Sequence, residues 1–91
     1  MKKTLKSLRF YVNKICNDLH LQLQEVGSDT YFNSEKQPDF ISITYKVDRS
    51  NLLIKIATNC GIFDITGHTS SINTLSKLVE LDRALWKVRA E

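Results

Sequence analysis

Cys60, Asp64 and His68 are the residues best suited to chemistry, and they follow one another at intervals of four. A thiol, a carboxylate and an imidazole can form a nucleophilic or metal-binding site when the backbone brings them together, as one face of a helix does. The segments around them, "NCG" and "IFDIT", instead have the composition of a turn and a strand, along which this spacing does not converge. We therefore predict no catalytic residues, no metal site and no cofactor, and we expect that the protein is not an enzyme.

The two cysteines, Cys16 and Cys60, are too few for a disulfide framework or a cysteine-rich zinc site. We expect both to be reduced thiols and Cys16 to be a core residue. No segment approaches the roughly 18 apolar residues needed to cross a bilayer, and the N-terminus lacks the uninterrupted apolar region of a signal peptide. These features predict a cytoplasmic protein with no membrane partner.

Positive charge is concentrated at the beginning of the chain. Residues 1–14 contain five of the 13 basic side chains and no acidic one, which leaves eight bases and ten acids in residues 15–91. The net charge of +3 therefore divides into +5 for the first segment and −2 for the remainder. A basic segment of this kind is often a solvated helix face, but it can also attract phosphate or an acidic protein surface.

Within this basic segment, an aromatic ring is flanked by lysines at the four-residue spacing of a helix face. The candidate basic patch consists of Lys3, Lys6, Phe10 and Lys14. An exposed ring in this setting can stack on a nucleic-acid base while the ammonium groups bind phosphates, or it can anchor a protein contact. In the alternative interpretation, Phe10 packs beneath the segment that contains Tyr31 and Phe32, and the lysines are merely solvated.

Apolar spacing predicts the first half of the chain. Apolar side chains recur at three- and four-residue intervals over residues 4–18, which indicates an amphipathic helix. Residues 19–26, "LHLQLQEV", alternate between apolar and polar, which favours a strand, although the helical stripe could also continue through them. Residues 27–39 concentrate Gly, Ser, Asp, Asn and the only Pro, and we expect a loop there.

Three alternating segments follow. "FISITYKV" and "LLIKIAT" are separated by the turn "DRSN" and predict an antiparallel hairpin. "IFDIT" then follows a three-residue connection in which Gly61 can adopt the left-handed conformation of a bulged hairpin. The sequence thus predicts one α+β domain over residues 1–91. It comprises an N-terminal helix, a three- to four-stranded antiparallel meander and a C-terminal helix, with both helices on one sheet face.

The predicted closing helix, residues 70–90, is preceded by hydroxyl side chains that can cap its first backbone N–H groups. At roughly 100° per residue, its apolar side chains form two sectors rather than one, with Asp82 between them. The first sector consists of Ile72, Leu75, Val79 and Trp86. The second consists of Leu78, Leu81, Leu85 and Val88. Together they cover nearly twice the circumference of about 100° that a surface helix usually buries.

Two interpretations of this excess are open. The sheet and the first helix can each cover one sector within a single chain, or one sector can be a docking face. The second sector, Leu78 to Val88, has the three- and four-residue steps of an antiparallel helix pair, so we take it as the candidate partner-binding face. The expected function is a small protein-binding inhibitor, adaptor or accessory factor, for which a homodimer is an option. The alternative is a nucleic-acid-binding module that uses the basic first helix.

Overall fold

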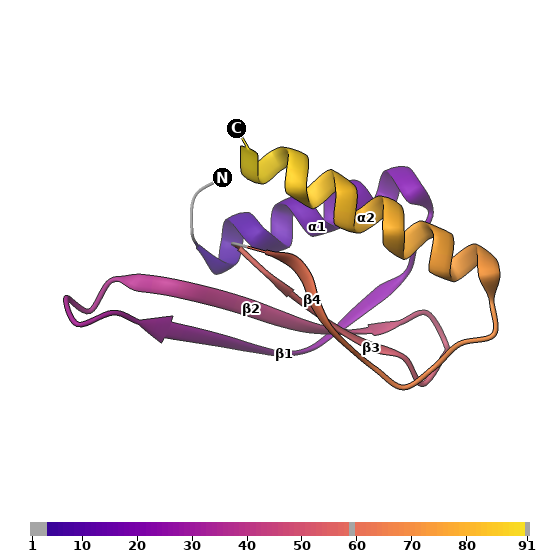
Figure 1. Ribbon diagram of the computed structural model, residues 1–91, viewed down its shortest axis with the longest axis horizontal. Coiled ribbons are helices and arrows are strands. Elements are labelled where there is room, and N and C mark those ends of the chain that lie inside the picture. The colour runs from indigo at the N-terminus through magenta and orange to yellow at the C-terminus, as the bar shows by residue number, and fades with distance from the viewer. Residues whose placement is uncertain (1–3, 59, 91) are drawn as a thin grey trace.

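The computed structural model describes residues 4–58 and 60–90. In chain order its elements are α1 (Leu5–Leu19), β1 (Leu23–Phe32), β2 (Pro38–Val47), β3 (Leu53–Ala57), β4 (Gly61–Thr66) and α2 (Ile72–Ala90). The strands form one antiparallel sheet in the order β1-β2-β3-β4, and both helices lie on one face of it (Figure 1). The predicted α+β meander and its two-layer arrangement are therefore confirmed, with four strands.

Helix α1 begins and ends with specific backbone capping. The hydroxyl of Thr4 accepts a hydrogen bond from the Ser7 backbone N–H at 3.1 Å, and the Ser7 hydroxyl accepts one from the Thr4 N–H at 3.4 Å. This reciprocal arrangement satisfies two of the N–H groups that the first turn leaves without helical partners. At the other end His20 adopts a left-handed conformation, and Lys77 of α2 donates a hydrogen bond to its carbonyl. The buried positions of α1 are Leu8, Val12 and Cys16.

The prediction for the first hairpin was wrong in its boundaries. Strand β1 starts at Leu23 rather than at residue 19, and most of the predicted loop 27–39 belongs to β1 and β2, with only residues 33–37 forming the turn. The Asn33 side chain closes this turn by accepting hydrogen bonds from the backbone N–H groups of Glu35 and Gln37. Strand β1 is exposed along nearly its whole length, and beyond Val26 no apolar alternation marks it in the sequence.

The remaining strands follow their predicted positions to within two residues. Alternate side chains of β2 and β3 point toward the helices and form the sheet's contribution to the core. The fully or nearly fully buried ones are Ile41, Ile43, Tyr45, Val47, Ile54 and Ile56. At the start of α2 the Ser71 hydroxyl accepts a hydrogen bond from the Thr74 N–H at 3.2 Å, which confirms the predicted capping by a serine. Neither of the helices in the described ranges is long and apolar enough to span a membrane.

The sector of α2 predicted as a partner-binding face is instead part of the core. Leu78, Leu81 and Leu85 are 4%, 0% and 2% exposed and belong to the same buried cluster as the core residues of α1 and the sheet. Val88, the fourth residue of that sector, is half-buried. The prediction that this sector is a partner-binding face is therefore wrong. Because α2 contacts both α1 and β4, the protein covers this sector within one chain.

The two sectors of α2 are expected to respond differently to truncation. Leu81→Ala should lower the free energy of unfolding by about 2–5 kcal/mol, because it removes a fully buried side chain and leaves a cavity. Ile72→Ala, at a position that is 79% exposed, should change it by only about 0.5 kcal/mol. Urea unfolding followed by circular dichroism, at the lowest protein concentration the signal allows, measures both. Equal losses would contradict this assignment of the sectors.

Candidate protein-binding surface

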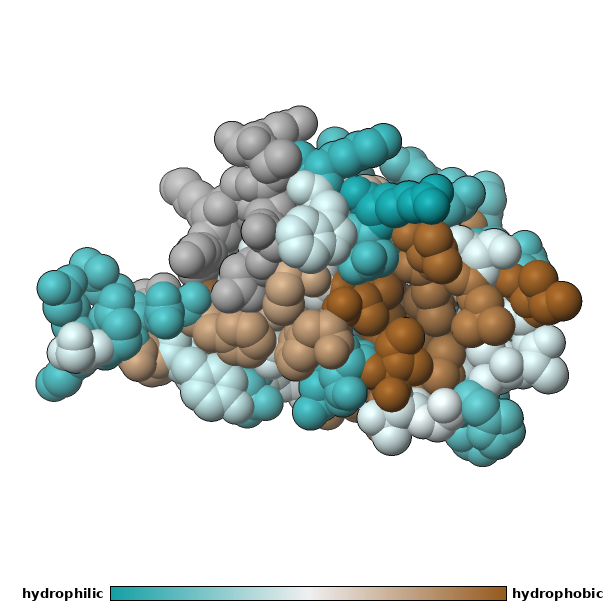
Figure 2. Space-filling model, viewed as in Figure 1, coloured by the Kyte–Doolittle hydropathy of each residue, from teal (hydrophilic) through white to brown (hydrophobic). Residues whose placement is uncertain are grey.

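An exposed apolar surface lies on α2 and the neighbouring edge strand β4. The first sector of α2, which we name the apolar stripe, consists of Ile72, Leu75, Val79 and Trp86. Its members range from 43% exposed at Trp86 to 79% at Ile72, and Ile65 of β4 is also exposed. Figure 2 shows the hydrophobic side chains gathered into one patch over these two elements. Contiguous exposed apolar surface on a small protein commonly marks an interaction site.

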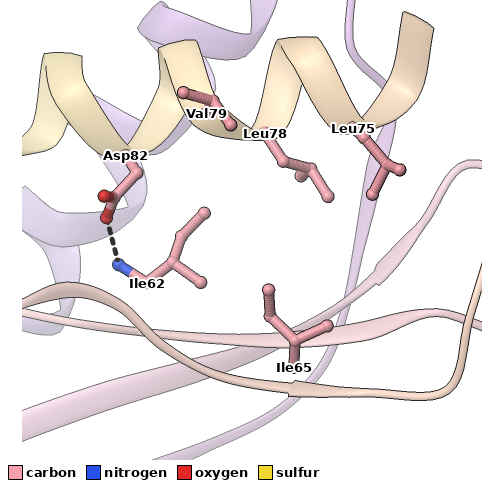
Figure 3. A pocket seen from close by; sticks show the side chains of 6 residues that line it. All are labelled: Ile62, Ile65, Leu75, Leu78, Val79 and Asp82. Atoms are coloured by element: carbon pink, nitrogen blue, oxygen red, sulfur yellow. Dashed lines mark hydrogen bonds between the residues drawn. The ribbon is translucent and has the colours of Figure 1, made fainter. Parts of the chain in front are cut away.

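A groove of about 270 Å³ separates the apolar stripe from β4. It is lined by Ile62, Ile65, Leu75, Leu78, Val79 and Asp82. Figure 3 shows the leucines pointing from α2 toward the strand and the isoleucines pointing from the strand toward the helix. The carboxylate of Asp82 accepts a hydrogen bond from the Ile62 backbone N–H at 2.9 Å, so the one charged side chain among the described lining residues already has a partner. The groove is suited to apolar side chains.

The backbone of β4 is shaped for this close contact with α2. A bulge in its pairing with β3 sets Lys55 opposite Asp64 and Ile56 opposite Ile62, so Phe63 is the extra residue. Gly61 precedes the bulge with a φ of +63°, and a Cβ placed there would lie 2.6 Å from the Asp82 carboxylate and 3.0 Å from the Trp86 indole nitrogen. The positive φ and these side-chain contacts with α2 both favour glycine at this position.

A second exposed apolar group lies on the sheet face away from the helices. The rings of Tyr31 and Phe63 each contact Phe40, with centroids 5.7 and 5.6 Å apart. Sequence reasoning missed this cluster because it placed Tyr31 in a loop. One available signal was the eight-residue alternation of "FISITYKV", since a strand paired along that length needs a partner that continues beyond Val26.

The candidate basic patch is present on α1 in part. Lys3 lies outside the described residues, while Lys6 and Lys14 are exposed. Phe10 is 52% exposed and stacks on the neighbouring ring of Tyr11, with centroids 5.3 Å apart and planes 9° from parallel. The alternative in which Phe10 packs beneath Tyr31 and Phe32 is therefore wrong.

Another base of the N-terminal segment is occupied within the protein. Arg9 donates two hydrogen bonds to the Glu25 carboxylate, at 2.8 and 2.7 Å, and this is the one ion pair among the described residues. The hydrogen bonds lower the pKa of Glu25 and raise the pKa of Arg9. Because the pair joins α1 to β1 at the surface, it removes one positive charge from what a phosphate ligand could use.

Reactive side chains are not brought together in the described structure. Cys60 is half-buried beside β4, whereas Asp64 and His68 are exposed, and the described residues contain no group of three or more His, Cys, Asp or Glu that could hold a metal ion. Burial raises the pKa of the Cys16 thiol to about 11, which keeps this thiol protonated and weakly nucleophilic at neutral pH. Burial likewise raises the pKa of the Tyr45 hydroxyl.

Comparisons of the chain with protein-family models, with curated protein sequences and with solved structures find no match. The candidate surface is therefore described from the structure of this chain alone. Its elements are the apolar stripe of α2, the exposed edge of β4 and the groove between them.

Substitution of the glycine beneath α2 should destabilise the protein. Gly61→Ala is expected to lower the free energy of unfolding by at least about 1–2 kcal/mol, because the new Cβ would force a left-handed alanine and displace the Asp82 carboxylate. Gly27→Ala is the matched control, since a Cβ at that position meets nothing within 4 Å. Chemical denaturation of the two variants makes the comparison, and a tolerated Gly61→Ala would show that the close approach is not needed.

Proposed function

We propose that this chain is a small non-enzymatic binding protein that acts through protein–protein contacts, as an inhibitor, adaptor or accessory factor. The observation that carries the proposal is the exposed apolar stripe of α2 beside the edge strand β4, with an apolar groove between them. Such a surface leaves apolar area in water that a partner could cover.

The arrangement around the stripe supports a protein partner. Exposed charged side chains at Glu80, Arg83 and Lys87 border the stripe on the same helix, whereas the stripe itself is uncharged. An apolar centre with a polar rim is the common organisation of protein interfaces, and tryptophan, here Trp86, is enriched among the residues that dominate their energy. At about 25 cal/mol per Å² of apolar area, covering the stripe could contribute several kcal/mol before association entropy is subtracted.

The same proposal assigns the protein to the cytoplasm. Support comes from the Cys16 thiol, which is buried in the core and forms no disulfide, because thiols persist in a reducing compartment. A disulfide at Cys16 in the protein isolated from its cell would argue against this location.

Site-specific photo-crosslinking tests the proposed surface. A photoreactive amino acid in place of Val79 should form adducts with protein in the cell of origin, because this position lies at the centre of the stripe. The matched control places the same group at Asp29, exposed on β1 at the opposite edge of the sheet. Adducts at position 79 and not at 29 support the proposal. The absence of protein adducts at position 79, or equal yields at both positions, would overturn it.

A second candidate function is nucleic-acid binding by α1. The observation that favours it is the exposed Phe10, stacked on Tyr11 and lying between Lys6 and Lys14 on the helix surface. Stacked rings with flanking ammonium groups are a common platform for single-stranded nucleic acid. The bidentate pairing of Arg9 with Glu25 reduces the positive charge on offer, which ranks this function below protein binding.

Salt dependence separates this candidate from a protein interface. If α1 binds single-stranded nucleic acid, affinity should fall steeply as salt rises, and Lys6→Glu with Lys14→Glu should abolish binding because two phosphate contacts become repulsive. Arg83→Glu with Lys87→Glu applies the same charge change on α2 and serves as the control. Fluorescence anisotropy of a labelled oligonucleotide measures both. A loss that is equal for the two double variants would show non-specific attraction rather than an α1 site.

A further inference from the structure

We propose that the sheet face turned away from the helices binds single-stranded nucleic acid, with bases stacked on the rings of Tyr31 and Phe63 and phosphates bound by Lys46 and Lys55. This site is separate from α1 and does not depend on the proposed protein-binding function. Three features carry the inference: the face is open, its aromatic rings form one cluster, and its two inner strands present positive but no negative charge.

The face is open because both helices lie on the other side of the sheet, as far as the described residues extend (Figure 1). Side chains alternate between the two faces along each strand. Since Ile41, Ile43 and Tyr45 of β2 are buried in the core with the helices, the residues that alternate with them point outward. By the same alternation, Lys55 of β3 points outward and is exposed. The outward positions of β2 are Phe40, Ser42, Thr44 and Lys46.

Three aromatic side chains form a continuous cluster on this face. The ring of Phe40 lies between those of Tyr31 and Phe63, with centroids 5.7 and 5.6 Å apart and planes inclined by 55° and 75°. Tyr31 is 57% exposed and Phe63 is 43% exposed. Because the rings meet at steep angles and the outer two remain about half exposed, they can stack on further planar groups. Stacking of bases on exposed rings is the contact that single-strand-binding proteins use without regard to sequence.

The charges on this face favour a polyanion that lies over its centre. The inner strands β2 and β3 carry Lys46 and Lys55 and no outward-facing acid, since Asp39 alternates to the other face. The outward-facing acids of the edge strands are Asp29 on β1 and Asp64 on β4. Neither lysine forms an ion pair within the described ranges. Phosphates over the inner strands would therefore meet ammonium groups, and the carboxylates would flank them on both sides.

The spacing of the rings and the lysines suits an extended ligand. At about 3.3 Å per residue, the six residues from Phe40 to Lys46 span roughly 20 Å. A strand of several nucleotides can contact both ends of this span, whereas a single nucleotide is too short. A duplex is less suitable, because its bases are stacked on one another and are not available to the rings. The arrangement therefore selects a single strand.

Fluorescence anisotropy of labelled oligouridylate and oligothymidylate of about twelve nucleotides tests the proposal, since single-strand-binding folds cover about 4–16 nucleotides. Binding is expected at low salt, and a preference for one probe identifies RNA or DNA as the ligand. Tyr31→Leu should weaken binding about 5- to 100-fold, because it keeps apolar surface but removes a stacking ring. Phe32→Leu is the matched control, since this ring is 63% exposed but alternates to the other face, and affinity should be unchanged.

The salt dependence of binding tests the phosphate contacts. Each phosphate contact contributes about 0.7 to the slope of log affinity against log salt for a single strand. Lys46→Gln with Lys55→Gln should therefore reduce the slope by about 1.4. Arg83→Gln with Lys87→Gln removes the same charge from α2 and should leave the slope as it is in the wild type. Circular dichroism checks that each variant remains folded.

The sheet face is overturned as the site if neither probe binds, or if Phe10→Leu on α1 abolishes binding while Tyr31→Leu does not. Equal changes in slope for the two double variants would also overturn it, because they indicate attraction to overall charge. If Tyr31→Leu does not fold, Phe63→Leu makes the same test at the other end of the ring cluster.

The test also separates this inference from the proposed protein-binding function. If neither probe binds and a photoreactive group at Thr44 captures protein, the sheet face is a protein interface and the inference is wrong. Adducts at Val79 without any binding of the oligonucleotides would leave the protein-binding function of the α2 and β4 surface standing. Binding of the oligonucleotides without adducts at Val79 would leave only the inference standing.

Discussion

The hydrogen bond from the Ile62 backbone N–H to the Asp82 carboxylate sets the rotation of α2 on the sheet. Gly61 leaves room for this carboxylate, because a Cβ at that position would lie 2.6 Å from it. Once Asp82 points at β4, helical geometry directs Leu81 and its sector toward the core and the apolar stripe toward the outer edge of β4. The charged residue between the two apolar sectors thus faces β4, the sector on one side of it is buried, and the sector on the other side forms the candidate surface.

The two helices share one face of a small sheet, and this constrains how much apolar surface the protein can cover. Helix α1 buries a narrow stripe through Leu8, Val12 and Cys16, while α2 must contact both α1 and β4. The core uses one sector of α2, and the other remains partly in water because, among the described residues, β4 is an edge strand of the sheet. Covering this exposed apolar area with a partner would be favourable, because folding of the chain leaves it in water.

The polar contacts on the other surfaces hold the helices and the strands together. The pair of Arg9 and Glu25 joins α1 to the sheet, and Lys77 of α2 contacts the end of α1 through the His20 carbonyl. These contacts fix the helices relative to each other and to the strands. The stacked ring of Phe10 is the exception, since it contacts a neighbour in its own helix and leaves half its surface exposed. It is the feature that keeps a nucleic-acid function of α1 under consideration.

The sequence by itself determined both helices, the strands β2 to β4 and the presence of two apolar sectors on α2. The helices show apolar residues at intervals of three and four, and the strands show a two-residue alternation. It indicated a strand over residues 19–26 but did not determine β1 beyond Val26, where its exposed residues carry no such pattern. It also could not choose between the two sectors of α2, and the sector starting at Leu78 was assigned to the surface wrongly. Only the tertiary structure decided that choice, because the rotation of a helix depends on contacts such as that of Asp82 with Ile62, which lie 20 residues apart in the chain.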